Sequence, residues 1–113
     1  MARTTVTAID PTLAGASITY SNADAANGND VVFNGDLQVV AKNTDGSDHT
    51  LTLKANGAKE KGVTIQDQTI TIPATSGHKL IDDIPRDYYC QSDGKLQIDW
   101  SSATGMTFYV VKK

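Results

Sequence analysis

Residues 37–55, LQVVAKNTDGSDHTLTLKA, contain two alternating runs of apolar and polar residues on either side of a polar turn. In an extended chain, Leu37, Val39 and Ala41 point to one side and their neighbours to the other. The same alternation resumes at Leu51 after the turn. Because Asp-Gly between two alternating runs is a strong hairpin signal, with the glycine supplying a positive φ, the segment predicts a β-hairpin. The alternative is two unrelated strands joined by a surface loop.

Further short alternating segments predict strands along the rest of the chain. They are residues 4–9, 16–20, 31–33, 68–72, 78–81, 95–100 and 106–111, with a weaker edge strand at 63–67. Between them, Pro85 is expected to begin a short helix or 3₁₀ segment that runs to Tyr89. About eight to ten short antiparallel strands without a long helix predict an all-β fold, a small two-sheet sandwich of jelly-roll type.

Length and composition indicate one domain with a single modest core. Residues 1–113 are expected to form one β-sandwich domain, in which residues 1–9 are an N-terminal arm or an edge strand. The net charge of −3 and the scattered Lys and Arg argue against a nucleic-acid-binding surface. No apolar run approaches the roughly 20 residues of a membrane span, and no signal-peptide core follows Met1. With a single cysteine and no internal disulfide, the chain is expected to fold in a reducing cytoplasm.

No group of residues has the spacing of a catalytic or metal site. His49 and His78 lie far apart, and Cys90 has no neighbouring Cys or His for a zinc cluster. A triad of Cys90, His78 and an aspartate at 82 or 83 has no support in the local sequence. The two adjacent aspartates face opposite sides of an extended chain and so make no acid–base pair. We therefore expect no enzyme, no metal and no cofactor.

The acidic, Asn-rich residues 21–30 (SNADAANGND) invite comparison with a calcium-binding loop. Asn22, Asp24, Asn27 and Asp30 do not have the alternate-position spacing of such a loop. This segment is expected to be a solvated, mobile loop.

The aromatic residues allow a sugar-binding platform or protein contact. The candidates for a platform are Tyr20, Tyr88, Tyr89, Trp100 and Tyr109. Against a platform, Trp100 shares the phase of the apolar residues 96 and 98, which predicts a core position. Tyr109 alternates with the core residues of the last strand, so it is expected on the outer face beside Val111. There it would form a small apolar patch suited to a protein partner.

Four pieces of the chain follow one another in a recognisable order. They are the hairpin VVAKNTDGSDHTLTLKA, the strand TITIPATSGHKLI, the irregular IPRDYYCQSDGKLQIDW and the terminal strand TGMTFYVVKK. In this order they resemble a family of small virion structural proteins that tailed bacteriophages encode near the major capsid gene. The resemblance runs from Val39 to Lys113. It is weaker over the first residues, as expected of an arm that adapts to a particular partner.

The resemblance implies a capsid decoration (cement) protein that binds the outer surface of the assembled head and stabilises it. Its partner would be the major capsid protein, with no nucleic acid or membrane involved. It would be synthesised in the host bacterial cytoplasm and end on the capsid exterior of the virion. Symmetric sites on a shell suit a homotrimer, and single copies on local axes are the other arrangement that the resemblance allows.

The expected contact residues come from three parts of the chain, because apolar bulk outside a strand needs a partner to bury it. They are Arg3, Thr4, Thr5 and Val6 in the arm, Ile84, Pro85, Arg86, Tyr88 and Tyr89 in the irregular segment, and Tyr109 on the last strand. Two alternatives stay open. One is a carbohydrate- or host-surface-binding module, and the other is a tail or head-closure component present in fewer copies.

Overall fold

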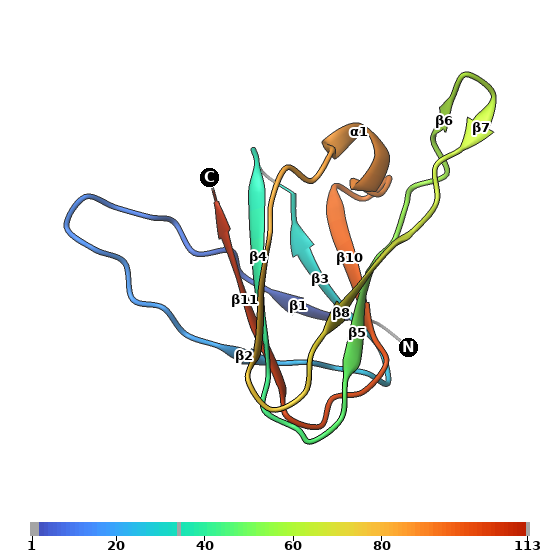
Figure 1. Cartoon of the computed structure of the whole chain (residues 1–113). Coiled ribbons are helices and arrows are strands. Elements are labelled where there is room, and N and C mark those ends of the chain that lie inside the picture. The colour runs from blue at the N-terminus through green and yellow to red at the C-terminus, as the bar shows by residue number, and fades with distance from the viewer. Residues whose placement is uncertain (1–2, 34, 113) are drawn as a thin grey trace.

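The chain folds as a β-sandwich in the computed structural model, which describes residues 3–33 and 35–112 (Figure 1). The five-stranded sheet has the order β1 (Thr4–Val6), β3 (Asn29–Val32), β10 (Lys95–Trp100), β5 (His49–Leu53) and β8 (Gln68–Ile72). The four-stranded sheet has the order β2 (Ser21–Asn22), β11 (Met106–Lys112), β4 (Leu37–Asn43) and β9 (Gly77–Ile81). Over these residues, the expected all-β, two-sheet architecture without a long helix is confirmed.

Strand alternation places the core between the two sheets. In β10, Leu96, Ile98 and Trp100 are buried, and in β11 the residues Met106, Phe108 and Val110 are buried, as their alternation predicts. Trp100 and Phe108 meet across the sandwich with ring centroids 4.9 Å apart. The central strands β4 and β5 add Leu37, Val39, Ala41, Leu51 and Leu53.

The predicted hairpin at residues 37–55 is wrong, because its two strands belong to different sheets. β4 pairs with β11 and β9, whereas β5 pairs with β10 and β8. Gly46 does not have the positive φ that a tight hairpin turn requires. The side chain of Asn43 instead shapes the crossing, since its Nδ2 donates to the carbonyl oxygens of Ser47 and Ile72 at 2.9 and 3.1 Å. The segment between β4 and β5 therefore connects two strands of different sheets, which is the alternative that the sequence left open.

Two further expectations near the N-terminus are wrong. Residues 16–20 form no strand, although their sequence alternates. Residues 21–30 are not a plain solvated loop, because they contain β2, a turn and the start of β3, with Ala23, Asn29 and Asp30 buried. In addition, β1 pairs with β3 in parallel, an exception to the expected antiparallel pattern.

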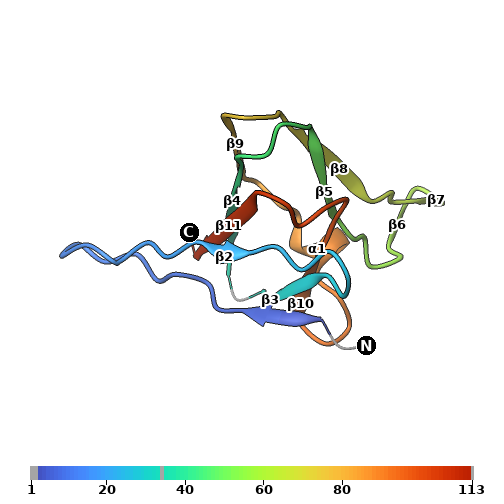
Figure 2. The same cartoon turned by 90° about the horizontal axis from the view of Figure 1, so that it is seen from below.

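Two segments project from the sandwich in different directions (Figures 1 and 2). One is the loop of residues 10–20 between β1 and β2, which we call the projecting loop. The other is the ribbon of β6 (Lys59–Glu60) and β7 (Val63–Thr64), inserted between β5 and β8. The short helix α1 (Arg86–Tyr89) follows Pro85, as predicted, and lies near one end of the sandwich.

Candidate functional site

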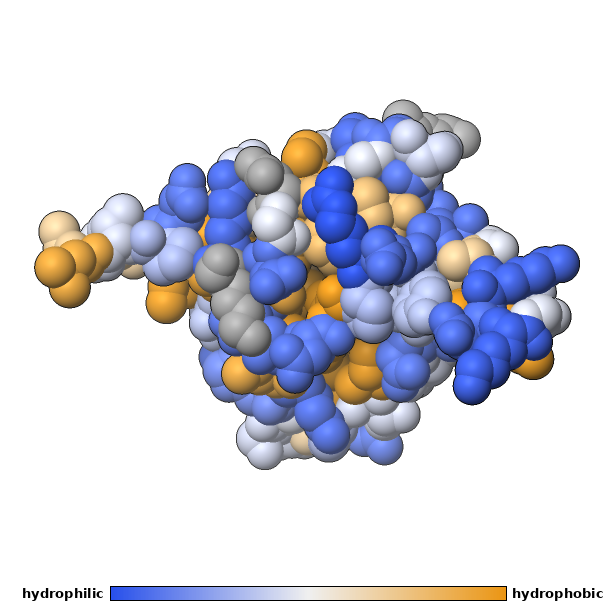
Figure 3. Space-filling model, turned by 90° about the horizontal axis from the view of Figure 1, so that it is seen from above, coloured by the Kyte–Doolittle hydropathy of each residue, from blue (hydrophilic) through white to orange (hydrophobic). Residues whose placement is uncertain are grey.

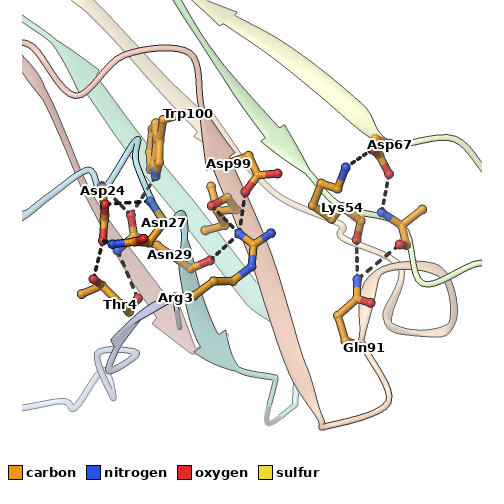
Figure 4. A network of polar contacts seen from close by, with 12 residues as sticks. Arg3, Thr4, Asp24, Asn27, Asn29, Lys54, Asp67, Gln91, Asp99 and Trp100 are labelled. Carbon is orange, nitrogen blue, oxygen red and sulfur yellow. Dashed lines mark hydrogen bonds and ion pairs between the residues drawn. The ribbon is translucent and has the colours of Figure 1, made fainter. Parts of the chain in front are cut away.

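The expected contact residues of the N-terminal arm are held against the sandwich. β1 lies at the edge of the five-stranded sheet, and Arg3 Nη1 donates to Asp99 Oδ1 at 2.5 Å and to the carbonyl oxygen of Ile98 at 3.2 Å (Figure 4). Thr4 Oγ1 donates to Asp24 Oδ2 at 2.6 Å. Thr5 is exposed, and Val6 packs against the core. Residues 1 and 2 of the expected arm lie outside the described residues.

The Asp24 carboxylate accepts the hydrogen bonds that connect β1 to the segment before β3. Besides the Thr4 hydroxyl, its Oδ1 accepts the backbone N–H of Asn27 at 3.1 Å. These hydrogen bonds, the one from Thr4 first, lower the pKa of the Asp24 carboxyl below its ordinary value. Two side chains expected at a partner, Arg3 and Thr4, are therefore already engaged within the chain.

The irregular segment is partly buried in the protein itself. Ile84 and Tyr89 are each 8% exposed, and the Tyr89 hydroxyl donates to the carbonyl oxygen of Gln66 at 3.1 Å. Arg86 donates to the carbonyl oxygen of Phe33 and lies over its ring. The reason for expecting a partner, apolar bulk left outside a strand, therefore does not apply to Ile84 and Tyr89.

Tyr88 is half-buried beside the projecting ribbon. Its hydroxyl donates to Glu60 Oε2 of β6 at 2.7 Å, and this contact with the carboxylate raises the pKa of the Tyr88 phenol. The hydrogen bond ties α1 to the ribbon, at the residue of β6 that precedes the turn.

A groove of about 580 Å³ runs between the edge strands β8 and β9, and we call it the edge groove. β8 ends the five-stranded sheet and β9 ends the four-stranded sheet, and no described strand bridges them. The lining is mainly apolar: Leu53, Ile65, Ile70, Leu80, Ile81, Ile84, Pro85, Tyr88 and Tyr89, with Gln68, Lys79, Asp82 and Asp83. Four of the ten expected contact residues thus meet here, and nothing local in the sequence shows that β8 and β9 face each other.

The outer face of the four-stranded sheet carries a second apolar surface. It comprises Tyr20, Val40, Leu80, Tyr109 and Val111, and we call it the sheet-face patch. The rings of Tyr20 and Tyr109 meet edge to face, with centroids 5.1 Å apart. Leu80 is 62% exposed, and a hollow of about 420 Å³ lies over this face between β9 and β11.

Polar groups border the sheet-face patch on one side. The Tyr20 hydroxyl lies 3.2 Å from His78 Nε2, and the Lys42 ammonium lies 5.8 Å from the centre of the Tyr20 ring. From the sequence, Tyr109 was expected to form a small apolar patch with Val111. It lies instead in a larger surface that contains further apolar and aromatic side chains.

The projecting loop carries apolar side chains that the sequence analysis missed as a surface. Leu13 is fully exposed at 107%, and Ile18 is 60% exposed. Figure 3 shows hydrophobic surface at the tip of this projection. The signal in the sequence was an apolar residue, Leu13, inside the turn-forming segment PTLAG, followed by the alternating run of residues 16–20.

The side chains considered for catalysis or metal binding lie in separate places. His49 Nε2 is 2.7 Å from Asp45 Oδ2, and His78 lies on the outer face of the four-stranded sheet. The backbone of Cys90 forms an isolated β-bridge with Leu96 of the five-stranded sheet. Across residues 3–33 and 35–112, no group of three His, Cys, Asp or Glu side chains is arranged to hold a metal ion. In the same ranges no helix has the length and apolar character needed to cross a membrane.

Nine of the ten expected contact residues are therefore divided among one sheet edge, the edge groove and the sheet-face patch, whereas Arg86 contacts Phe33. Together with the projecting loop, the groove and the patch are apolar surfaces suited to binding other proteins. Comparison of the chain with known protein families, curated proteins and solved structures found no match.

Proposed function

We propose that this protein is a bacteriophage capsid decoration protein that binds the outer surface of the assembled head and stabilises it. The observation that carries the proposal is the sheet-face patch, an exposed apolar surface on the face of a sheet. The sequence resemblance to small virion structural proteins supports the choice of partner, the major capsid protein.

The patch suits binding to a broad protein surface. Its residues come from β4, β9 and β11 and from the end of the projecting loop, so hydrogen-bonded neighbours hold most of them in place. Burying the exposed part of a side chain such as Leu80 contributes roughly 1–2 kcal/mol. Several such contacts with aromatic residues among them match the composition of a protein interface.

Stabilisation of the shell follows from mass action. A protein that binds the assembled shell better than its separate subunits shifts the equilibrium toward assembly. We propose that it is made in the host cytoplasm and acts on the capsid exterior of the virion as a homotrimer. The net charge of −3 suits a protein that contacts other protein and not nucleic acid.

The experiment mixes the purified protein with expanded, undecorated capsids and counts the bound copies per particle. Saturable binding at a number that matches a set of symmetry-related shell sites is the expected result. Tyr109→Asp places a charge in the patch without changing the lining of the edge groove, and should abolish most binding. Val63→Asp is the matched control, because Val63 is 67% exposed on the ribbon, away from the patch. Absence of binding by the wild type would overturn the proposal.

Arg86→Ala and Tyr88→Ala test the irregular segment separately. If this segment contacts the capsid, both variants should bind fewer copies while keeping their fold. Unchanged binding of both variants would remove the segment from the contact and leave the sheet-face patch as the docking surface.

The Tyr20–Tyr109 pair also favours a second candidate, a carbohydrate-binding module on a head or tail appendage. Exposed aromatic rings beside polar groups can stack on sugar rings, but Trp100 and Tyr89 are buried and cannot join this platform. Glycan binding that changes tyrosine fluorescence and is lost in Tyr109→Ala would favour this candidate. A tail or head-closure component would differ in copy number, with few copies per particle.

A further inference from the structure

We propose that the projecting loop of one copy of this protein docks in the edge groove of a second copy. The proposal rests on two complementary features of the same chain: an extended apolar loop without a partner strand, and an apolar groove between two edge strands. It concerns association between copies, and so stands apart from whether the assembly coats a capsid.

Part of the projecting loop has the sequence pattern of a β-strand but pairs with no other strand. Residues 16–20, ASITY, alternate and contain the β-favouring residues Ile18, Thr19 and Tyr20, yet they join no sheet. A strand sequence with exposed backbone and an exposed apolar side chain is a template for pairing with another chain. Residues 11–20 carry no charged side chain, so their burial has no cost of desolvating a charge.

The base of the loop is fixed, which directs the loop outward. The backbone N–H of Ile9 donates to Val110 at 2.7 Å, and the N–H of Lys112 donates to Ile9 at 2.9 Å. The other leg leads into β2, which also pairs with β11. Both legs are therefore anchored on β11.

The groove offers edges and apolar surface of matching length. β8 and β9 each contain five residues and span roughly 17 Å, long enough to pair with residues 16–19, while Tyr20 stays packed against Tyr109 in the sheet-face patch. Both are edge strands, which can accept an added strand. Ile65, Ile70 and Ile81 supply apolar surface in the groove for Ile18 to contact.

Tyr20, at the base of the loop, reaches His78 of β9 on the outer face of the sheet, but the rest of the loop points away from the groove. In the four-stranded sheet the order is β2-β11-β4-β9, so the loop is rooted at one edge and the groove lies at the other. Figures 1 and 2 show the loop extending away from β8 and β9. A second copy can bring the apolar part of its loop, with Ile18, to this groove.

The geometry favours a closed assembly. Each copy contributes its loop to one neighbour and its groove to another, so every copy takes part in two contacts. A head-to-tail contact of this kind closes into a ring when the rotation allows it.

Sedimentation equilibrium over the micromolar range tests association. The wild type should have a mass larger than one chain, and Ile18→Asp should weaken association on the order of 100-fold. Ile18 does not belong to the core, so the variant should keep its thermal stability. Val63→Asp, the same kind of change on the other projection, should associate like the wild type. A monomeric wild type, or equal effects of the two variants, would overturn the proposal.

A cross-linking experiment tests where the loop docks. In a Cys90→Ser background, Ile18→Cys and Lys79→Cys chains are mixed and oxidised. A disulfide-linked pair should form in the mixture well above the yield from either variant alone. Val63→Cys mixed with Lys79→Cys is the control and should give little product. Equal yields from both mixtures would show that the loop does not occupy the groove.

Discussion

The indole Nε1 of Trp100 donates a hydrogen bond of 2.8 Å to Oδ1 of Asn29, deep in one end of the sandwich (Figure 4). The same oxygen accepts the backbone N–H of Asp24 at 2.9 Å, while Asn29 Nδ2 donates to the carbonyl oxygen of Thr4 at 3.2 Å. Asn29 is 1% exposed. One buried amide thus joins β1, β3, β10 and the turn before β3.

Asn29→Ala should lower the free energy of unfolding by about 2–3 kcal/mol, because it leaves the buried Trp100 N–H without an acceptor. Urea unfolding followed by the fluorescence of Trp100, the single tryptophan, measures the change. Asn27→Ala is the matched control, since Asn27 is half-buried and its amide makes a longer contact, 3.4 Å, with Asp24. Equal losses in the two variants would contradict the central role of Asn29.

Gly46→Ala should leave stability unchanged or raise it by up to about 1 kcal/mol, because Gly46 has an ordinary φ and alanine restricts the unfolded chain. A Cβ at this position would have open space around it. Gly94→Ala is the comparison: its site is equally open, but φ is +81°, so the variant should lose about 1 kcal/mol. Urea midpoints of the two variants give the test. A clear loss in Gly46→Ala would instead indicate a tight turn at residues 45–46.

The sequence predicted where most strands lie and which of their sides are buried, but not which strands pair. Alternation along 37–43 and 49–53 specifies a buried face for each strand, and that face can pack in either sheet. The Asp-Gly signal is local. The connection between the sheets is instead fixed by a hydrogen bond from the Asn43 side chain to the carbonyl oxygen of Ile72, a residue far along the chain. Pairing therefore depended on contacts that no local pattern contains.

The same limit applies to the candidate surfaces. Tyr109 could be placed on an outer face from the phase of β11, because that phase is a local property. The edge groove depends on β8 and β9 ending different sheets, which is a property of the topology. Asn29 was assigned to a loop from its polarity, but polar side chains with complete hydrogen bonding can be buried.

Acidification should destabilise the protein through three carboxyls with lowered pKa values. Hydrogen bonds from Thr4, His49 and Lys54, respectively, are the first cause for Asp24, Asp45 and Asp67. A folded-state pKa below the unfolded value of 3.8 favours the ionised carboxylate in the fold. This contribution is present above pH 3.8 and is lost as the pH falls through the folded-state values.

Urea midpoints at neutral pH and near pH 3 measure this loss. Asp67→Asn should be less stable than the wild type at neutral pH and should lose less on acidification. The variant keeps an oxygen to accept the backbone N–H of Ala55 but not the charge that pairs with Lys54 Nζ at 2.7 Å. The same acid sensitivity in variant and wild type would exclude Asp67 as a source of the pH dependence.

Arg3→Met should loosen β1 without unfolding the sandwich, because the guanidinium joins the edge strand to Asp99 and to the carbonyl oxygen of Ile98 on β10. The side chains of Arg3 and Asp99 are 19% and 41% exposed, so solvent weakens the ion pair to about 1 kcal/mol. The amide of Thr4, which donates to Gly28 at 3.1 Å, should then exchange its hydrogen about fivefold faster. The amides of β10 should keep their wild-type protection. Lys54→Met removes the other cation of Figure 4 and is the matched control, with no expected change at Thr4. Unchanged exchange at Thr4 in Arg3→Met would mean that β3 pairing and Asn29 hold the edge strand by themselves.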